Sequence, residues 1–158
     1  MLLLFLQAAV AQPPLNLTCV GGGTANKAAV ATVNSYGNAS GMVGTTPFSA
    51  SGNGTSTVTT MRHQGFEDQV DLRLFGGDDR IRMPRTMLPP LHGGADGWFK
   101  LKEVRVDDRS IKASAAVNFM NNPKVYVDRV TGTITISGRA GDFTGQCEAM
   151  DPQAPKKF

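Results

Sequence analysis

Two cysteines, Cys19 and Cys147, stand near the two ends of the chain and constrain its fold more than any other feature. An even number of cysteines predicts an intramolecular disulfide, and two cysteines allow only one pairing. Such a bridge would tie the first expected strand to the last one, and it persists in oxidising compartments. The alternative, two buried free thiols or a redox pair, is less favoured because no C-x-x-C spacing occurs.

The first residues indicate how the chain reaches such a compartment. Residues 1–11 form a short apolar run whose last three residues are Ala9-Val10-Ala11, and the small residues Ala9 and Ala11 suit cleavage after Ala11. The run lacks the usual positive charge, so an ordinary N-terminal strand is the alternative. The sequence therefore predicts a signal peptide over 1–11, a single β domain over 12–158, and a periplasmic or secreted protein.

The charge balance is mildly basic, with a formal net charge of +3 and an isoelectric point near 9.1. This balance is common among exported proteins and does not by itself indicate nucleic acid binding. In an exported protein, acidic polymers of the cell envelope are the more plausible anionic partners.

From residue 56 onward, apolar residues alternate with polar ones, which is the period-two pattern of half-buried strands. The alternations cover 70–75, 80–83, 99–106 with a bulge before Val104, 111–119, 125–127, 134–136 and 143–147. Turn-forming residues separate them, at 76–79, 107–108, 121–123, 131–132 and 141–142. This cadence predicts an all-β, single-domain antiparallel barrel or sandwich with one solvated sheet face.

Residues 21–60 differ in composition and are rich in Gly, Ser, Thr, Asn and Ala. Because Gly and Asn favour turns over strand pairing, we expect loops and short weak strands here. Alanines within Thr24–Val33 favour a short helix capped by Thr24. Asn-x-Ser/Thr triplets begin at Asn16, Asn38 and Asn53, and in a segment of this composition chance is their simplest explanation.

A transmembrane barrel is disfavoured by the strand lengths. Outer-membrane barrels need strands of about 9–11 residues and two aromatic girdles. Most of the expected strands are shorter, aromatic residues make up only 7% of the chain, and prolines interrupt its last residues, 151–158. No apolar run approaches the ~20 residues of a membrane-spanning helix. We therefore expect a protein that does not span a membrane.

Catalytic and metal-binding patterns are weak in this chain. It has two histidines, His63 and His92, too few for a zinc site once both cysteines are oxidised. The His92-Gly93-Gly94 segment has no accompanying Gly-x-Ser-x-Gly nucleophile motif. The best catalytic set is His92, Asp96 and Arg85, which is poor. The sequence thus predicts no enzyme, no metal and no cofactor.

One basic stretch has the composition of a binding site. Arg80, Arg82 and Arg85 alternate with other residues, and Lys100 follows Trp98 in the next expected strand. Clustered guanidinium groups bind carboxylate, phosphate or sulfate in a bidentate manner, and an indole can stack on a ligand ring. The alternative is a charged outer sheet face that prevents edge aggregation. These five residues are the candidate site for an envelope polyanion or a small amphiphile.

Motifs near both ends of the chain and in its middle carry a resemblance. The chain contains Asp128-Arg129-Val130-Thr131-Gly132, then Gly145-Gln146-Cys147, together with Leu17-Thr18-Cys19 and the segments 82–90 and 98–101. In these motifs it resembles uncharacterised small exported proteins of alphaproteobacteria that have a C-terminal Asp-Arg-x-Thr-Gly hairpin and a Gly-x-Cys strand. The resemblance implies export, the disulfide and a β fold, and it supplies no activity.

Two functions are compatible with this sequence. The first is a non-enzymatic exported β protein that binds a small ligand or an envelope component. The second is a structural or assembly protein of the envelope, in which residues 21–60 would become ordered on a partner. A hydrolase is the least favoured alternative.

Overall fold

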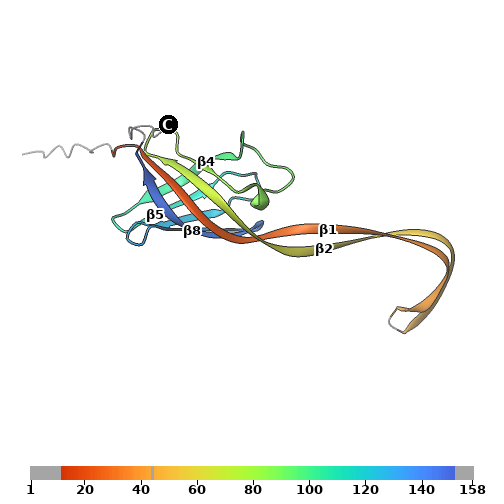
Figure 1. The fold of residues 1–158 in the computed structure, drawn as a ribbon. Helices are drawn as coiled ribbons and strands as arrows, with labels where there is room; N and C mark the ends of the chain where they lie inside the picture. The colour runs from red at the N-terminus through yellow and green to blue at the C-terminus, as the bar shows by residue number, and fades with distance from the viewer. Residues whose placement is uncertain (1–11, 44, 152–158) are drawn as a thin grey trace, which may run out of the picture. The chain divides into compact units, whose positions relative to one another are not determined.

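The computed structural model describes residues 12–43 and 45–151. These residues form two compact units, a barrel made of 12–26 and 64–151 and a ribbon, Lys27–His63. The strands are β1 (Leu15–Val43), β2 (Thr46–Leu74), β3 (Arg80–Arg82), β4 (Trp98–Val106), β5 (Ser110–Ala115), β6 (Lys124–Asp128), β7 (Thr133–Gly138) and β8 (Gly141–Met150). In the described part of the chain the single helix is a 3-10 turn, η1 (Arg85–Met87) (Figure 1).

The strands close into an antiparallel barrel in chain order, from β1 round to β8. This confirms the predicted all-β fold and selects a barrel over a sandwich. The β4–β5 pairing is interrupted between Lys102 and Arg105, where Glu103 has a positive φ of 54°. The interruption confirms the bulge expected before Val104.

The interior of the barrel is filled by the apolar members of the alternating strands. Leu72, Ile81 and Phe99 lie opposite one another on β2, β3 and β4 and are all buried. With eight strands, a barrel is just wide enough for side chains to fill it. The inward side chains pack into one cluster, which includes Leu17, Val70, Leu74, Leu101, Ile111, Ala113, Val125, Val127, Ile134, Ile136 and Phe143.

Glycines form the seam at which the barrel closes. On β1 and β8, Gly21 lies opposite Gly145, and Gly23 lies opposite Phe143. A Cβ atom at Gly21 would overlap the carbonyl oxygen of Thr144, and one at Gly23 would overlap that of Asp142. The two backbones thus approach more closely than side chains would allow, which is one of the known uses of glycine within strands.

The predictions for residues 21–60 are wrong in two respects. This region holds neither the short helix over Thr24–Val33 nor mainly loops, because all of its described residues except Thr45 lie within β1 and β2, each 29 residues long. Strand pairing has overridden the local preferences of Ala and Gly, which are weak. The expectation that most strands are shorter than about 9–11 residues is also wrong, because β4, with 9 residues, and β8, with 10, reach that length as well.

Two smaller boundaries also differ from the sequence pattern. β5 ends at Ala115, so the alternation over 111–119 does not continue as a strand, and Phe119 is 90% exposed. The last turn lies between β7 and β8, and Gly141 already belongs to β8 rather than to the turn.

The predicted disulfide is present. Cys19 on β1 lies directly opposite Cys147 on β8, and their sulfur atoms are 2.02 Å apart. A disulfide indicates a non-reducing compartment. The predicted signal peptide, residues 1–11, lies outside the described residues. Within the described residues, no helix is both long and apolar enough to cross a bilayer.

The Asp-Arg-x-Thr-Gly motif builds a turn and joins it to a neighbouring hairpin. The Asp128 carboxylate accepts hydrogen bonds from the backbone N–H groups of Val130 and Thr131, at 2.8 and 3.1 Å. Gly132 takes the positive φ of 71° that closes the turn. Arg129 reaches across and donates to the carbonyl oxygen of Asp107, 2.9 Å away. All five residues of the motif therefore have a structural role.

Two carboxylates at these hairpin tips predict a pH dependence. The Ser110 hydroxyl and the N–H groups of Arg109 and Ser110 lower the pKa of Asp107, and the N–H groups of Thr131 and Val130 lower the pKa of Asp128. Each carboxylate therefore stabilises the folded protein at any pH above its pKa in the unfolded chain, which is near 4. This stabilisation is lost as the pH falls through the lower pKa that the same group has in the folded protein. The Asp107→Asn/Asp128→Asn variant should therefore show a smaller fall in melting temperature between neutral and acid pH than the wild type.

Melting temperatures measured from about pH 6 down to about pH 2 would test this expectation, since both ordinary and lowered carboxyl pKa values fall in that range. Asp108→Asn, in the same turn as Asp107, is the matched control and should keep the wild-type profile. Parallel profiles for the double variant and the wild type would contradict the assignment of the acid sensitivity to these two turns.

Candidate functional site

The sequence Arg-Ile-Arg of β3 builds the centre of a charged outer surface. Ile81 is fully buried, so Arg80 and Arg82 on either side of it point outward. The ladder sets Arg80 between Arg73 of β2 and Lys100 of β4. Three cations from three adjacent strands therefore lie in one row across the barrel wall.

A second outward-facing row lies beside the first. It consists of Asp71 on β2, Arg82 on β3 and Trp98 on β4. We call Arg73, Arg80, Arg82, Trp98 and Lys100 the basic patch. The Arg73 guanidinium lies 4.4 Å from the centre of the Trp98 ring and so connects the two rows diagonally. This distance is within the range of a cation–π interaction, which holds the guanidinium beside the indole without neutralising its charge.

Carboxylates neutralise part of the basic patch. Arg80 pairs with Asp78 at 2.6 Å, and Arg82 lies 3.8 Å from Asp71. Asp71 also accepts hydrogen bonds from Thr18 and Gln69. In the described part of the chain, neither Arg73 nor Lys100 has a carboxylate within 4 Å. These two cations are therefore the members of the patch best placed to receive an external anion.

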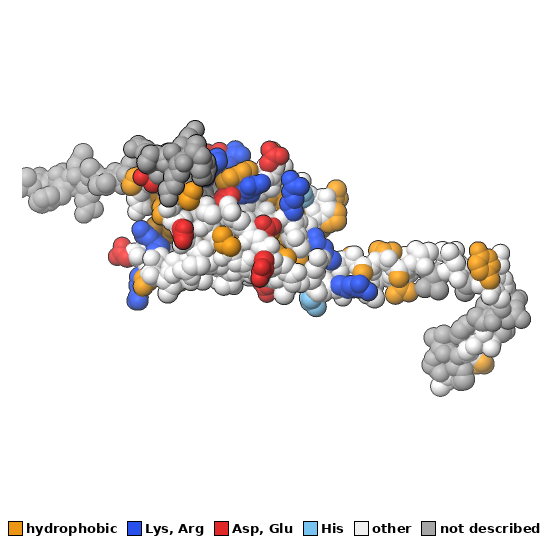
Figure 2. Space-filling view, in the orientation of Figure 1, with side chains coloured by type: hydrophobic (Ala, Val, Ile, Leu, Met, Phe, Trp, Pro, Cys, Tyr) orange, Lys and Arg blue, Asp and Glu red, His pale blue; other side chains and the backbone are white. Residues whose placement is uncertain are grey.

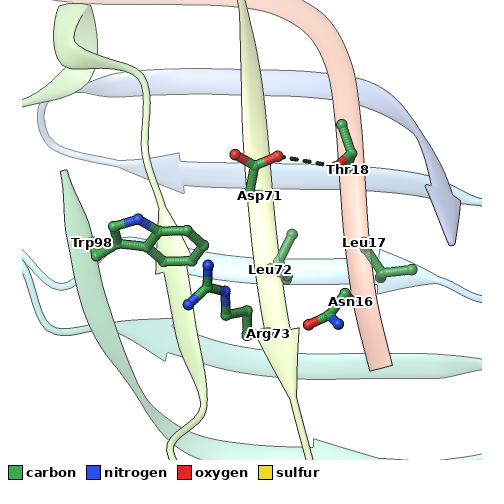
Figure 3. Close-up of a pocket in the computed structure, with 7 residues that line it drawn as sticks. All are labelled: Asn16, Leu17, Thr18, Asp71, Leu72, Arg73 and Trp98. Atoms are coloured by element: carbon green, nitrogen blue, oxygen red, sulfur yellow. Dashed lines mark hydrogen bonds between the residues drawn. The ribbon is translucent and has the colours of Figure 1, made fainter. Parts of the chain in front are cut away.

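Two hollows of the barrel surface adjoin the patch. One, of about 400 Å3, is lined by Asn16, Leu17, Thr18, Asp71, Leu72, Arg73 and Trp98 (Figure 3). Figure 3 shows the indole of Trp98 and the guanidinium of Arg73 side by side, with the Asp71–Thr18 hydrogen bond above them. A second hollow, of about 440 Å3, also includes Arg73 and Trp98 and adds Asp78 and Arg80. Arg73 and Trp98 thus border both hollows.

The structure brings together four of the five predicted site residues. Arg80, Arg82, Trp98 and Lys100 lie on the paired strands β3 and β4. Arg85 lies outside these two strands, in η1 beyond the end of β3, and adjoins Arg82 but neither Arg73 nor Trp98 in a hollow. It lines a different hollow, of about 330 Å3, together with Arg82 and Asp68.

Sequence reasoning missed Arg73, although its position was visible. Arg73 alternates with the buried Leu72 and Leu74, so it had to point outward. The short turn after β2 makes β2 and β3 an antiparallel pair, which places Arg73 opposite Arg80. Pairing the strands on either side of the Gly76–Asp79 turn would have added it to the site.

The weak catalytic set is also brought together, but without catalytic contacts. Arg85, His92 and Asp96 line one hollow of about 400 Å3. Nδ1 of His92 instead lies 2.9 Å from the carbonyl oxygen of Gly93, and its ring packs edge-on against Phe99. In the part of the chain that the structure covers, no hydrogen bond joins these three side chains, and no group of His, Cys, Asp and Glu is arranged to hold a metal ion.

Comparison with protein-family models, with curated proteins and with solved structures finds no match to this chain. The basic patch and the compartment that the disulfide indicates are therefore the features that bear on the function of this chain.

Proposed function

We propose that this chain is an exported, non-catalytic β-barrel protein of the periplasm or the extracellular space that binds an anionic ligand on its outer face. The observation that carries the proposal is the row Arg73, Arg80 and Lys100, set across three strands beside Trp98. The disulfide supports a location outside the reducing cytoplasm.

The spacing of the row favours a polyanion over a single small ion. Adjacent strands lie about 4.8 Å apart, so the three cations extend across about 10 Å of the surface. Anionic groups repeated along a polymer could meet them in turn, while the flat indole of Trp98 offers apolar surface to a sugar ring. We therefore propose an anionic polysaccharide of the cell envelope as the ligand class.

Heparin, a sulfated polysaccharide, is a suitable probe. Replacing Arg73 and Lys100 together by Gln removes the two cations that lack carboxylate partners. Exposed ionic contacts are worth about 0.2–1 kcal/mol each, so we expect roughly tenfold weaker binding at low salt. The measurement is a dissociation constant by calorimetry, together with the salt concentration that elutes the protein from immobilised heparin.

A matched variant separates a site from a general effect of charge. Arg105 and Lys112 lie opposite each other on β4 and β5, and both are exposed. Arg105→Gln/Lys112→Gln removes the same charge from another part of the barrel and should change heparin affinity less than about twofold. If the two variants lost heparin affinity equally, the binding would depend on net charge alone, and the proposed site would be wrong.

A further inference from the structure

The ribbon, Lys27–His63, is built from β1 and β2 alone. Within it, the hydroxyl of Thr55 donates to the side-chain oxygen of Asn34, 3.2 Å away, so these two residues share a face. The ladder between β1 and β8 ends at Ala25, and the ladder between β2 and β3 begins at Asp71. Among the described residues, no third strand pairs with either strand of the ribbon.

Two open edges follow from this arrangement. In a two-stranded ribbon, about half of the backbone N–H and C=O groups of each strand point away from the partner strand. Such edges are templates for pairing with another strand, and an isolated two-stranded ribbon is marginal in water. The geometry therefore provides hydrogen-bonding capacity for at least one more strand on either side.

Between Ala28 and Met61 the ribbon lacks the charged residues that usually protect an open edge. Natural edge strands carry charged residues, above all Lys, or prolines and bulges that block pairing. From Ala28 to Met61 the chain has no Asp, Glu, Lys, Arg or His, and it has one proline, Pro47. In Figure 2 the described side chains along most of the ribbon are accordingly white and orange.

Exposed apolar side chains lie along the same uncharged stretch. Tyr36 is 80% exposed, and Val30, Val58 and Met61 are also exposed. An open, long and partly apolar strand edge marks a site of association rather than a solvated surface.

We infer that this ribbon is a self-association element, which pairs edge to edge with the ribbon of a second copy of this chain. A twofold axis relates two identical strand edges in an antiparallel arrangement. The same edge of two copies of the chain can therefore pair with itself. Each chain has a formal net charge of +3, which opposes self-association except through an uncharged surface such as this one. Many residues of the ribbon are Ala, Ser, Thr or Gly, whose short side chains do not hinder a second ribbon from lying alongside.

A lipid bilayer fits the ribbon less well as the partner. Membrane-spanning strands present an apolar band to lipid, bounded by aromatic girdles. Between Ala28 and Met61 the ribbon has two aromatic residues, Tyr36 and Phe48, and no Leu or Ile. A second ribbon satisfies the open backbone groups directly, whereas lipid leaves them unsatisfied until a barrel closes.

Sedimentation velocity of the full mature chain, from about 1 to about 100 µM, tests the inference. We expect the mass to rise with concentration to at least twice that of one chain. Hydrogen exchange of the wild type should show amides of residues 28–61 becoming protected over the same concentrations, while barrel amides do not change. A single-chain mass throughout would overturn the inference.

A charged variant and its neutral match assign the interface. Thr57 and Thr59 are exposed on β2, and Thr57→Lys/Thr59→Lys places two like charges on each facing copy. We expect the dissociation constant of the Lys variant to be at least tenfold higher, and its association to be restored in high salt, which screens the repulsion. The Thr57→Gln/Thr59→Gln variant should stay associated. Equal association of both variants would place the interface elsewhere. A monomer that binds phosphatidylcholine–phosphatidylglycerol vesicles would assign the ribbon to a bilayer and likewise overturn the inference.

Discussion

Replacement of Cys19 and Cys147 together by alanine is expected to lower the free energy of unfolding by about 5 kcal/mol. The bridge joins residues separated by 128 positions, so it restricts almost the whole unfolded chain of the barrel. In the chain-entropy model, a loop of this length gives one of the largest stabilisations available to a single disulfide. A loss of this size is a large share of the stability of a typical domain.

Equilibrium unfolding in urea measures this effect and identifies its origin. The alanine variant should unfold at a lower urea concentration and with a steeper dependence on urea, because an unfolded chain without the bridge exposes more surface. Wild-type protein in reductant should reproduce the curve of the variant, and reductant should leave the variant unchanged. A loss below about 1 kcal/mol, with an unchanged slope, would show that the bridge does not restrict the unfolded chain.

The sequence indicated an all-β barrel or sandwich through a local signal and left closure into a barrel undetermined. Val70, Leu72 and Leu74 alternate with polar neighbours, and this alternation alone assigns them to the core. Gly21 and Gly23 carry the opposite local signal, since glycine favours turns. Their role depends on β8, more than a hundred residues further along the chain, which no local pattern encodes.

The basic patch was predictable to the same extent. Arg80 and Arg82 could be assigned to one face from their spacing, because Ile81 between them is apolar. Their neighbours depend on register: Arg73 lies opposite Arg80 only because β2 and β3 are joined by a short turn. Arg85 shares the spacing of these arginines, but β3 ends at Arg82, so spacing alone does not place it on the same face.

Gly23→Ala is the second change for which we expect a large effect, a loss of at least about 3 kcal/mol or a failure to fold. The new Cβ atom would overlap the carbonyl oxygen of Asp142, which is a backbone atom and cannot rotate away. Relief would require β1 and β8 to separate, which would disturb both the ladder that closes the barrel and the Cys19–Cys147 pair in the same register. The measurement is urea unfolding of the purified variant, or its yield in the soluble fraction.

Gly65→Ala is the matched control, because Gly65 also lies in a strand, β2, and a Cβ atom there would meet nothing within 4 Å. That change should be neutral or stabilise the protein by about 0.5 kcal/mol, since it reduces the freedom of the unfolded chain. The difference between the two variants therefore isolates the close approach at the seam from the general cost or benefit of replacing a strand glycine. If Gly23→Ala unfolded at the same urea concentration as Gly65→Ala, the glycines of β1 would have no special part in closing the barrel.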